Sequence, residues 1–390
     1  MYKTGVIAIF LVFALQLRSY SDHPTLNYSY VQQRYQQTIR PRTPNESIIT
    51  LLPINYAAEP ASFSEFTVRR DRRSSRILNQ AGADLAVLDE KTKAFLNNNK
   101  RPKWFMTTEY SHLKMRRNDT DYALSNEGTT RAIGSGNIHE LRFDRDDNFR
   151  AEIGIKLDDG WKLGVKYSNY RTFASDSVVA PEGGNIFATR THPEVNEVAE
   201  NASSSFLFNS NIFDLELRGN LELSQHASME LFGGFRWAQI DQEMHSDYNG
   251  FDFAQGVVEQ TNNSNLFGLR IGTLGRYEVA ANFYAFGGAE VSLLFGDHQV
   301  NLNESDAVGV PAMIVDIEDN YDQINIVIGA NLGVGWKHDG FDFRLGYELN
   351  LWTNLADRLV FLDDTHEAVF SHTTHDVMFD GFYMRLSQEF

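Results

Sequence analysis

The feature that most constrains the fold is a period of two in the apolar residues between positions 103 and 390. The cleanest run places an apolar side chain at every second position: Phe341, Phe343, Leu345, Tyr347, Leu349 and Leu351. This alternation puts the apolar groups on one face of a β-strand and the polar groups on the other. Similar rows recur at 149–157, 161–167, 213–223 and 324–336. The C-terminal three quarters of the chain therefore predict antiparallel β-structure.

Ten runs reach about ten residues, the length that a tilted strand needs to cross a bilayer. Their expected spans are 103–113, 148–157, 161–171, 204–223, 229–242, 264–278, 283–296, 322–337, 341–352 and 377–390. Short connections at 158–160, 224–228, 279–282 and 338–340 alternate with long ones at 114–147, 172–203, 243–263, 297–321 and 353–376. The pattern predicts an all-β fold: a transmembrane antiparallel up-and-down β-barrel of about ten strands, with about 8 to 12 allowed and both termini in the periplasm.

A soluble sandwich or a lipocalin-like barrel is the alternative, because its strands also alternate. The strand lengths and the alternation of short and long connections favour the membrane barrel, since lipid offers no hydrogen bonds and only a closed sheet leaves no edge. The chain ends on a row of apolar residues: Phe382, Met384, Leu386 and Phe390. This row resembles the signal read by the barrel-assembly machinery, which we expect as a partner, although Gln388 departs from the usual apolar residue.

Composition removes several classes. A mean hydropathy of -0.37 excludes a bundle of membrane helices. With 52 acidic against 35 basic residues, a net charge of -17 argues against nucleic-acid binding. The chain has no cysteine, which excludes disulfides and thiolate chemistry. The remaining classes fit an envelope protein.

The first hundred residues predict two further segments. Residues 1–21 resemble a signal peptide, with Lys3 before the apolar run 5–15, and imply export to the outer membrane. Residues 22–100 predict a periplasmic linker with an amphipathic helix at 77–98, which offers a route to a homo-oligomer. A basic cluster in the linker could contact anionic lipid or lipopolysaccharide, or could be a solvated charge run: Arg69, Arg70, Arg72, Arg73 and Arg76. Residues 101–390 form the predicted barrel.

Three segments, in this order, carry a resemblance to a known family. They are Phe283-Tyr-Ala-Phe-Gly-Gly-Ala-Glu-Val-Ser-Leu-Leu-Phe-Gly296, Phe343-Arg-Leu-Gly-Tyr-Glu-Leu-Asn-Leu-Trp352 and Phe379-Asp-Gly-Phe-Tyr-Met-Arg-Leu386. Together they resemble the Legionella-type major outer membrane protein family over roughly residues 103–390. The resemblance implies a pore-forming outer-membrane protein, with no catalytic residues and no cofactor to carry over.

The polar face of the strands supplies the candidate pore-lining residues. They are Glu109, Arg150, Glu152, Lys156, Lys166, Asp214, Glu216, Arg218, Glu230, Arg236, Arg270, Glu290, Arg344, Glu348 and Arg385. Both signs are well represented, and two interpretations stay open. The charges could pair across strands and fill a closed, salt-bridged core. They could also line a water-filled path for small polar or ionic solutes.

The predicted function is a porin-like pore for small polar or ionic solutes. Acidic loops without Lys or Arg at 243–263 and 297–321 would make it mildly cation-selective. A structural or adhesive barrel with a closed lumen is the alternative, and an outer-membrane hydrolase is a third. The residue types for hydrolysis or metal binding gather in the last loop, without a spacing that singles out a pair: Asp363, Asp364, His366, His372, His375 and Asp376. We therefore expect no catalytic or metal site.

Overall fold

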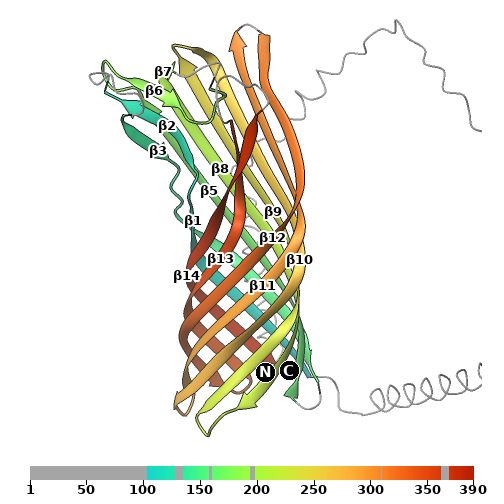
Figure 1. Ribbon diagram of the computed structural model, residues 1–390. Helices are drawn as coiled ribbons and strands as arrows, with labels where there is room; N and C mark the ends of the chain where they lie inside the picture. Colours follow the sequence, from blue (N-terminus) through green and yellow to red (C-terminus); the bar gives the residue numbers. More distant parts are fainter. Residues whose placement is uncertain (1–102, 128–134, 158–159, 194–197, 309, 362–368) are drawn as a thin grey trace, which may run out of the picture. The chain divides into compact units, whose positions relative to one another are not determined.

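The computed structural model describes residues 103–390, except 128–134, 158–159, 194–197, 309 and 362–368, and the side chains of 307–312. Ten antiparallel strands close into a barrel (Figure 1). In ring order these are β1 (Lys103–Arg117), β14 (Phe370–Glu389), β13 (Phe341–Phe361), β12 (Val310–His338), β11 (Phe283–Val308), β10 (Phe253–Ala280), β9 (Ala227–Gly250), β8 (Asn201–Glu222), β5 (Lys162–Val179) and β4 (Arg145–Lys156). The predicted fold class and strand number are confirmed.

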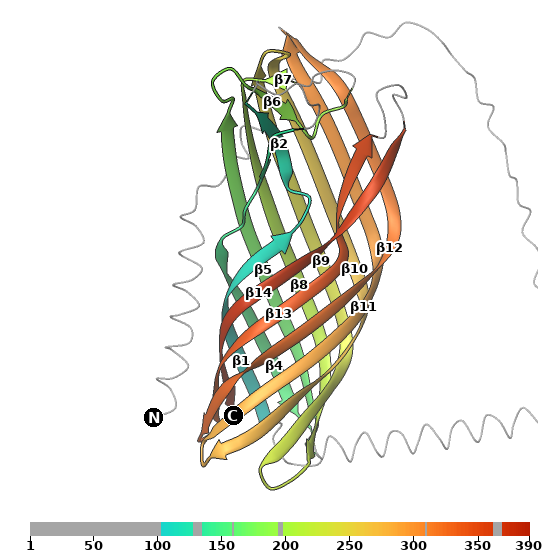
Figure 2. The same cartoon turned by 60° about the vertical axis from the view of Figure 1, so that its left-hand side comes forward.

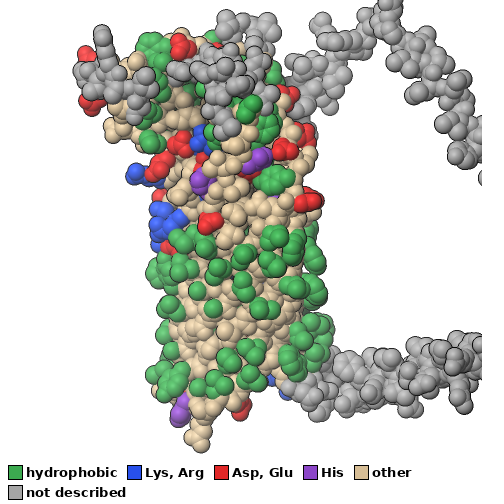
Figure 3. All heavy atoms as spheres, in the orientation of Figure 1, with side chains coloured by type: hydrophobic (Ala, Val, Ile, Leu, Met, Phe, Trp, Pro, Cys, Tyr) green, Lys and Arg blue, Asp and Glu red, His purple; other side chains and the backbone are tan. Residues whose placement is uncertain are grey.

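The direction in which the apolar and the polar faces of the strands point decides between a membrane barrel and a soluble one. Phe343, Leu345 and Leu349 are 40–45% exposed on the outside of the barrel, and a lower band of the surface is rich in apolar side chains (Figure 3). The residues between them, such as Arg344 and Glu348, are only 6–7% exposed on the inside. A soluble barrel would have the reverse arrangement, because water would cover the outer face. The apolar band is therefore a lipid-facing belt.

The short connections lie at one end of the barrel, which we call the turn end. Between β12 and β13 the turn residues Asp339 and Gly340 have positive φ angles of 47° and 82°. A two-residue turn of this kind matches the twist of the paired strands, and the Asp-Gly sequence is well suited to it. The C-terminus lies at the same end, where the Phe390 amide donates to the Trp104 carbonyl at 2.8 Å beside the β1–β14 seam. The C-terminal end of β14, which carries the outward-facing Phe382 and Met384, therefore lies at the turn end of the barrel.

The opposite end, which we call the loop end, differs from the prediction. The segments 243–263 and 297–321 were expected to be acidic loops, but most of their residues continue β9, β10, β11 and β12 well beyond the belt. The apolar alternation ends where the lipid ends, whereas strand pairing needs only backbone hydrogen bonds and continues with polar side chains. Glu304 and Asp306, within the segment expected to be a loop, are only 2% and 6% exposed. The expectation that 243–263 and 297–321 form long loops was therefore wrong.

Two of the long connections fold into a small sheet of their own. Its order is β3 (Asn137–Glu140), β2 (Asp121–Asn126), β6 (Asn185–Ala188) and β7 (Val198–Ala199). The buried Tyr122 of β2 accepts, at its carbonyl, a 2.6 Å hydrogen bond from the Tyr248 hydroxyl of β9. The sheet therefore packs on the loop end of the barrel (Figures 1 and 2).

The predicted signal peptide, the basic cluster and the helix at 77–98 lie outside the described residues. Within the part of the chain that the structure describes, we find no helix long and apolar enough to cross a membrane.

Candidate functional site

The candidate site is the part of the lumen that lies behind the lipid-facing belt, which we call the charged lumen. The structure brings most of the predicted inward-facing residues together there, in one set of ion pairs. Alternation along each strand explains this placement, because the neighbours of an inward charge are outward apolar residues. Asp214 is 1% exposed, for example, whereas Phe213 and Leu215 on either side of it are 40% and 44% exposed.

The centre of the charged lumen is built around the Asp214 carboxylate of β8. The Arg236 guanidinium of β9 binds it with two nitrogens, at 2.7 and 3.0 Å. The Lys166 ammonium lies 3.0 Å from Asp214 and 3.2 Å from Glu216. Arg270 of β10 contacts Glu216 and also Glu290 of β11. Five neighbouring strands are thereby joined by charge pairs across the inside of the barrel.

Arg150 of β4 bridges two carboxylates on the other side of the lumen. Its two terminal nitrogens each lie 2.7 Å from an oxygen of Glu348 on β13, and one of them lies 2.5 Å from Glu109 on β1. The side chains of all three are at most 15% exposed. A bidentate Arg–carboxylate pair of this kind fixes both partners in direction as well as in distance.

A third group of ion pairs connects β4 and β14 to the Asp214 centre of the charged lumen. Arg218 lies 2.7 Å from Glu152 and 2.6 Å from Glu216, and Arg385 of β14 lies 3.1 Å from Glu152. Lys156 differs from the rest, because its side chain is 38% exposed and pairs with Glu389 at 3.5 Å near the turn end. Lys156 therefore belongs to the mouth of the barrel and not to its interior.

The turn end of the charged lumen contains two charged residues that were not among the predicted pore-lining residues, Arg276 and Asp342. They join the predicted Glu230 and Arg344: Arg276 lies 3.6 Å from Glu230, and Arg344 lies 3.0 Å from Asp342. The Tyr284 hydroxyl contacts Asp342 as well. Arg276 and Asp342 have the same parity as Arg270 and Arg344, so strict counting along the strands would have found them.

The charged lumen contains as many acids as bases. The acids are Glu109, Glu152, Asp214, Glu216, Glu230, Glu290, Asp342 and Glu348, and the bases are Arg150, Lys166, Arg218, Arg236, Arg270, Arg276, Arg344 and Arg385. Each base has at least one carboxylate partner in this set. The interior at membrane depth is therefore close to neutral while being densely charged.

Toward the loop end the inward-facing positions carry apolar residues. We call this set the apolar plug, and it includes Phe206, Phe208, Ile240, Met244, Leu266, Leu294, Leu355 and Leu359, each at most 5% exposed. Between the plug and the charged lumen lies a cavity of about 120 Å³, lined by charged residues such as Arg150 and Arg236 and by apolar ones such as Phe208 and Trp352. The cavity has room for several waters.

Part of the plug comes from the upper β13–β14 hairpin, residues 353–361 and 370–376, which folds into the barrel. Pairing between β12 and β13 ends at Val327 and Trp352, and Figure 2 shows the hairpin leaving the line of β12 beyond this point. The chain turns at Asn354, which has a positive φ of 52°. We call this segment the infolded hairpin.

Inward-facing amides of the barrel wall hold the backbone of the infolded hairpin. The Gln242 side chain of β9 donates to the Leu355 carbonyl at 3.0 Å, and Gln260 of β10 donates to the Asp357 carbonyl at 2.8 Å. Asn325 of β12 donates to the Thr353 carbonyl at 3.0 Å. The wall thus replaces the strand partners that the hairpin gives up when it leaves β12.

Among the described candidates from the last loop, His372 lies in a network with two carboxylates. Its Nδ1 lies 2.6 Å from Asp357 and its Nε2 lies 2.9 Å from Asp319. Partial burial lowers the pKa of His372, but the hydrogen bonds and charges of the two carboxylates outweigh it and raise this pKa above its ordinary value. Because both ring nitrogens contact carboxylates, neither is free to activate a water in this arrangement.

The other candidates of the last loop do not form a site in the described structure. Asp376 accepts a hydrogen bond from the Asn354 amide at 3.0 Å, and His375 lies beside Ala356 in the β13–β14 register. Asp363, Asp364 and His366 lie outside the described residues. Within the described ranges no group of three or more acidic or His side chains is arranged to hold a metal ion.

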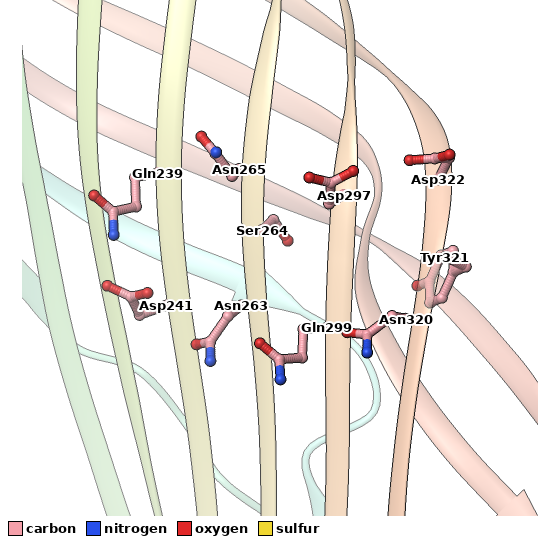
Figure 4. Close-up of a pocket in the computed structure, with 10 residues that line it drawn as sticks. All are labelled: Gln239, Asp241, Asn263, Ser264, Asn265, Asp297, Gln299, Asn320, Tyr321 and Asp322. Carbon is pink, nitrogen blue, oxygen red and sulfur yellow. The ribbon is translucent and has the colours of Figure 1, made fainter. Parts of the chain in front are cut away.

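A second hollow, of about 470 Å³, lies on the outer surface of the barrel (Figure 4). Four neighbouring strands supply its polar lining: Gln239, Asp241, Asn263, Ser264, Asn265, Asp297, Gln299, Asn320, Tyr321 and Asp322. Most of these residues follow directly on the last lipid-facing residues of β9 to β12, such as Trp237 and Phe295. The rim of the belt on this flank is therefore polar and acidic, and none of its lining residues is basic.

The closed barrel, its apolar outer belt and its charged interior define the class of protein: an outer-membrane β-barrel. The family described as the Legionella pneumophila major outer membrane protein precursor matches residues 98–390, and the chain belongs to that family. The resemblance seen in the sequence is confirmed.

The solved structures that resemble this chain are themselves outer-membrane proteins. The outer membrane protease OmpT of Escherichia coli is 12% identical, with 75% of this chain and 99% of that chain covered and a TM-score of 0.43. The translocator domain of the autotransporter NalP of Neisseria meningitidis is 8% identical, with 80% and 97% covered and a TM-score of 0.33. The attachment invasion locus protein Ail of Yersinia pestis is 8% identical, with 74% and 98% covered and a TM-score of 0.21. A search of curated proteins finds no significant match.

Proposed function

We propose that this protein is a gated pore that lets small polar or ionic solutes cross the outer membrane, with the infolded hairpin as its gate. The observation that carries the proposal is the charged lumen at membrane depth. Burying ion pairs costs desolvation, and well-packed apolar residues of similar volume are often at least as stabilising. The loop end of this barrel shows that apolar packing is available to it. A charged interior behind the lipid belt is therefore better explained by a path for solutes than by stability.

The infolded hairpin supports gating because it closes the loop end with contacts that can be released. Its backbone is held by side-chain amides of the wall and not by a complete strand ladder. Its turn at Asn354 gives one point about which the hairpin could move. Behind the infolded hairpin lies the cavity of about 120 Å³. Opening would join that cavity to the outside, and rearranged ion pairs in the charged lumen would complete the path.

Single-channel recording of the full chain in planar bilayers tests this function. We expect the unaltered protein to be closed for most of the time, with brief steps, and Leu355→Asp to raise the open probability at least tenfold, because a carboxylate does not fit in the apolar plug. Val360→Asp is the matched control, since it adds the same charge to the same strand on the side that faces away from the plug. The absence of steps from both the unaltered protein and Leu355→Asp would end the pore proposal.

The proposed selectivity is mildly cationic. The charged lumen is balanced, so the bias would come from the acidic loop end, where Asp316 and Glu318 are exposed on the β12 extension. A salt gradient across the bilayer should give a reversal potential that favours cations. An anion-selective potential would contradict this part of the proposal and leave the pore itself intact.

A structural or adhesive barrel is the second candidate, and the apolar plug favours it. A permanently closed barrel would present its long β9–β12 extensions to a surface partner and would conduct nothing. Leu355→Asp separates the two candidates: a structural barrel would lose local packing without gaining conductance.

A further inference from the structure

The outer surface of the barrel has a second flank that the charged lumen does not explain. On β1, β4 and β5 four outward-facing positions next to the belt are basic: Lys114, Arg116, Arg145 and Arg171. The outward Asp147 of β4 lies among them, where it accepts a hydrogen bond from Tyr110 and lies 2.8 Å from His112. Figure 3 shows Lys and Arg side chains gathered on one flank, directly above the apolar band. We call these four residues the basic rim. At the corresponding height on β9 to β12 the rim is polar and acidic (Figure 4).

The register places the charges of the basic rim close together. Lys114 lies directly opposite Arg145 across the β1–β4 pair, and opposite Asp380 across the β1–β14 pair. Like charges on directly opposite positions of neighbouring strands repel, so this pair is unfavourable unless an anion lies near it.

Asp380 supplies one negative charge near this pair, which neutralises only part of the positive charge. Its carboxylate contacts Arg116 and lies 3.8 Å from Arg145, and the Tyr347 hydroxyl binds it too. With a side chain only 3% exposed, Asp380 is covered by these partners. Among the residues that the structure describes, Lys114 and Arg171 make no ion pair with a carboxylate. With Asp380 and Asp147 as the acids of this flank, the four bases leave two positive charges in excess.

The neighbourhood of the basic rim is that of a lipid and not of a free anion. On the turn-end side of the basic rim, the outward side chains of β4, β5 and β14 are apolar: Ile153 is 55% exposed, Val165 is 48% exposed and Phe382 is 58% exposed. On β1 the outward Tyr110 lies four residues below Lys114. An anion held here would have apolar surface directly below it, and aromatic residues at this height are typical of the headgroup level.

We propose that the basic rim binds the phosphate groups of a phosphorylated glycolipid of the outer leaflet, with the acyl chains lying on the belt below. Arg side chains bind phosphate with several directed hydrogen bonds, and Lys adds a compact positive charge. The occupant is a lipid A phosphate, since only a lipid satisfies the cations and the apolar surface together. The site is on the barrel itself and is separate from the basic cluster at 69–76. The proposal is independent of the pore.

Native mass spectrometry of the full chain with bisphosphorylated lipid A tests the site. We expect the double variant Lys114→Gln and Arg171→Gln to bind lipid A at least about tenfold more weakly, because each Lys or Arg near a membrane surface contributes about one kcal/mol of attraction. The variant should fold normally, because neither side chain forms an ion pair with a carboxylate of the described residues. Lys103→Gln with Lys337→Gln is the matched control: it removes two exposed cations at the turn end and should bind as the unaltered chain does.

Three results would overturn the proposal. Equal binding by the basic-rim variant and the control would show that these side chains are not involved. Equal binding of lipid A stripped of its phosphates would show that acyl chains alone are recognised. Full displacement of lipid A by millimolar inorganic phosphate would show a site for a free anion. Conductance is a separate measurement, so loss of this site would leave the pore proposal standing.

Discussion

On β8 to β11 the two halves of the lumen share one inward-facing parity and differ in the side chains that occupy it. Behind the lipid belt the inward positions are charged and paired, as at Asp214 and Arg236. Toward the loop end they are apolar, as at Phe208 and Ile240. The alternation that makes a barrel thus leaves the chemistry of the interior free. In this chain the charged lumen and the apolar plug therefore lie next to each other inside one barrel.

The largest effect should come from breaking an ion pair in the charged half. Arg150→Met would leave Glu109 and Glu348 buried without their shared cation, at a cost of about 3–5 kcal/mol of unfolding free energy. Urea titration of the protein refolded into detergent would measure it. The triple variant Glu109→Gln, Arg150→Met and Glu348→Gln should recover most of the loss. If the triple variant is no more stable than the single one, the cost does not arise from stranded charge.

The apolar half should respond more locally. Leu355→Ala removes a fully buried side chain from the plug and should weaken docking of the infolded hairpin by about 3 kcal/mol. Faster amide hydrogen exchange at 353–361, with unchanged exchange in the barrel strands at belt level, is the expected signature. Leu349→Ala is the control, because Leu349 faces the lipid. Uniform acceleration throughout the barrel would show that the two halves are one cooperative unit.

The next prediction concerns the pH dependence of stability that arises from Glu304, on the extension of β11. Burial, with a smaller contribution from the Asp306 charge, raises the pKa of Glu304 to about 7 against the lowering effect of the His192 amide. A carboxyl group with a raised pKa costs stability as pH rises from about 4.5 to about 7, because the unfolded chain ionises first. Glu304→Gln should therefore stabilise the protein by about 2 kcal/mol at pH 8 and change little at pH 4. Equal effects at both pH values would exclude titration as the cause.

The smallest expected effect concerns His372 on the infolded hairpin. Its pKa is raised by Asp357 and Asp319, so its contribution is present below the ordinary His pKa and is lost as pH rises through the raised value. Gating should become easier in alkaline solution, by about 1 kcal/mol in the closed-to-open equilibrium. Recording open probability against pH for the unaltered chain and for His372→Gln measures this. A pH dependence that is the same in both would assign it to another group.

The sequence predicted the barrel well because its signal is local. The alternation in 341–352 is visible in consecutive residues and is imposed by lipid on one side of the sheet. The inward position of residues such as Glu152 and Arg385 follows from the same parity. The hairpin extensions of β9 to β12 were missed, because outside the belt the outward face becomes polar and the inward face mixes apolar residues such as Met244 with polar ones. The period of two therefore fades while the strand ladder continues.

The pairing within the lumen could not be predicted from parity. Arg150 contacts Glu348 at a separation of 198 residues, and that contact depends on closure of the ring. The infolding at Asn354 was missed for a related reason: nothing in residues 353–361 distinguishes a strand that continues upward from one that turns into the barrel. The turn becomes favourable only when Gln242, Gln260 and Asn325 are already placed opposite to receive it.

By itself, the sequence determined which side chains face lipid and which face inward, because a strand offers only two faces and the period of two assigns each residue to one of them. Tertiary structure decided whether the inward charges meet partners, whether the loop end is open, and where cations of β1, β4 and β5 gather on the rim. Those outcomes depend on which strands become neighbours when the sheet closes, and closure brings together residues whose separation along the chain carries no local signal.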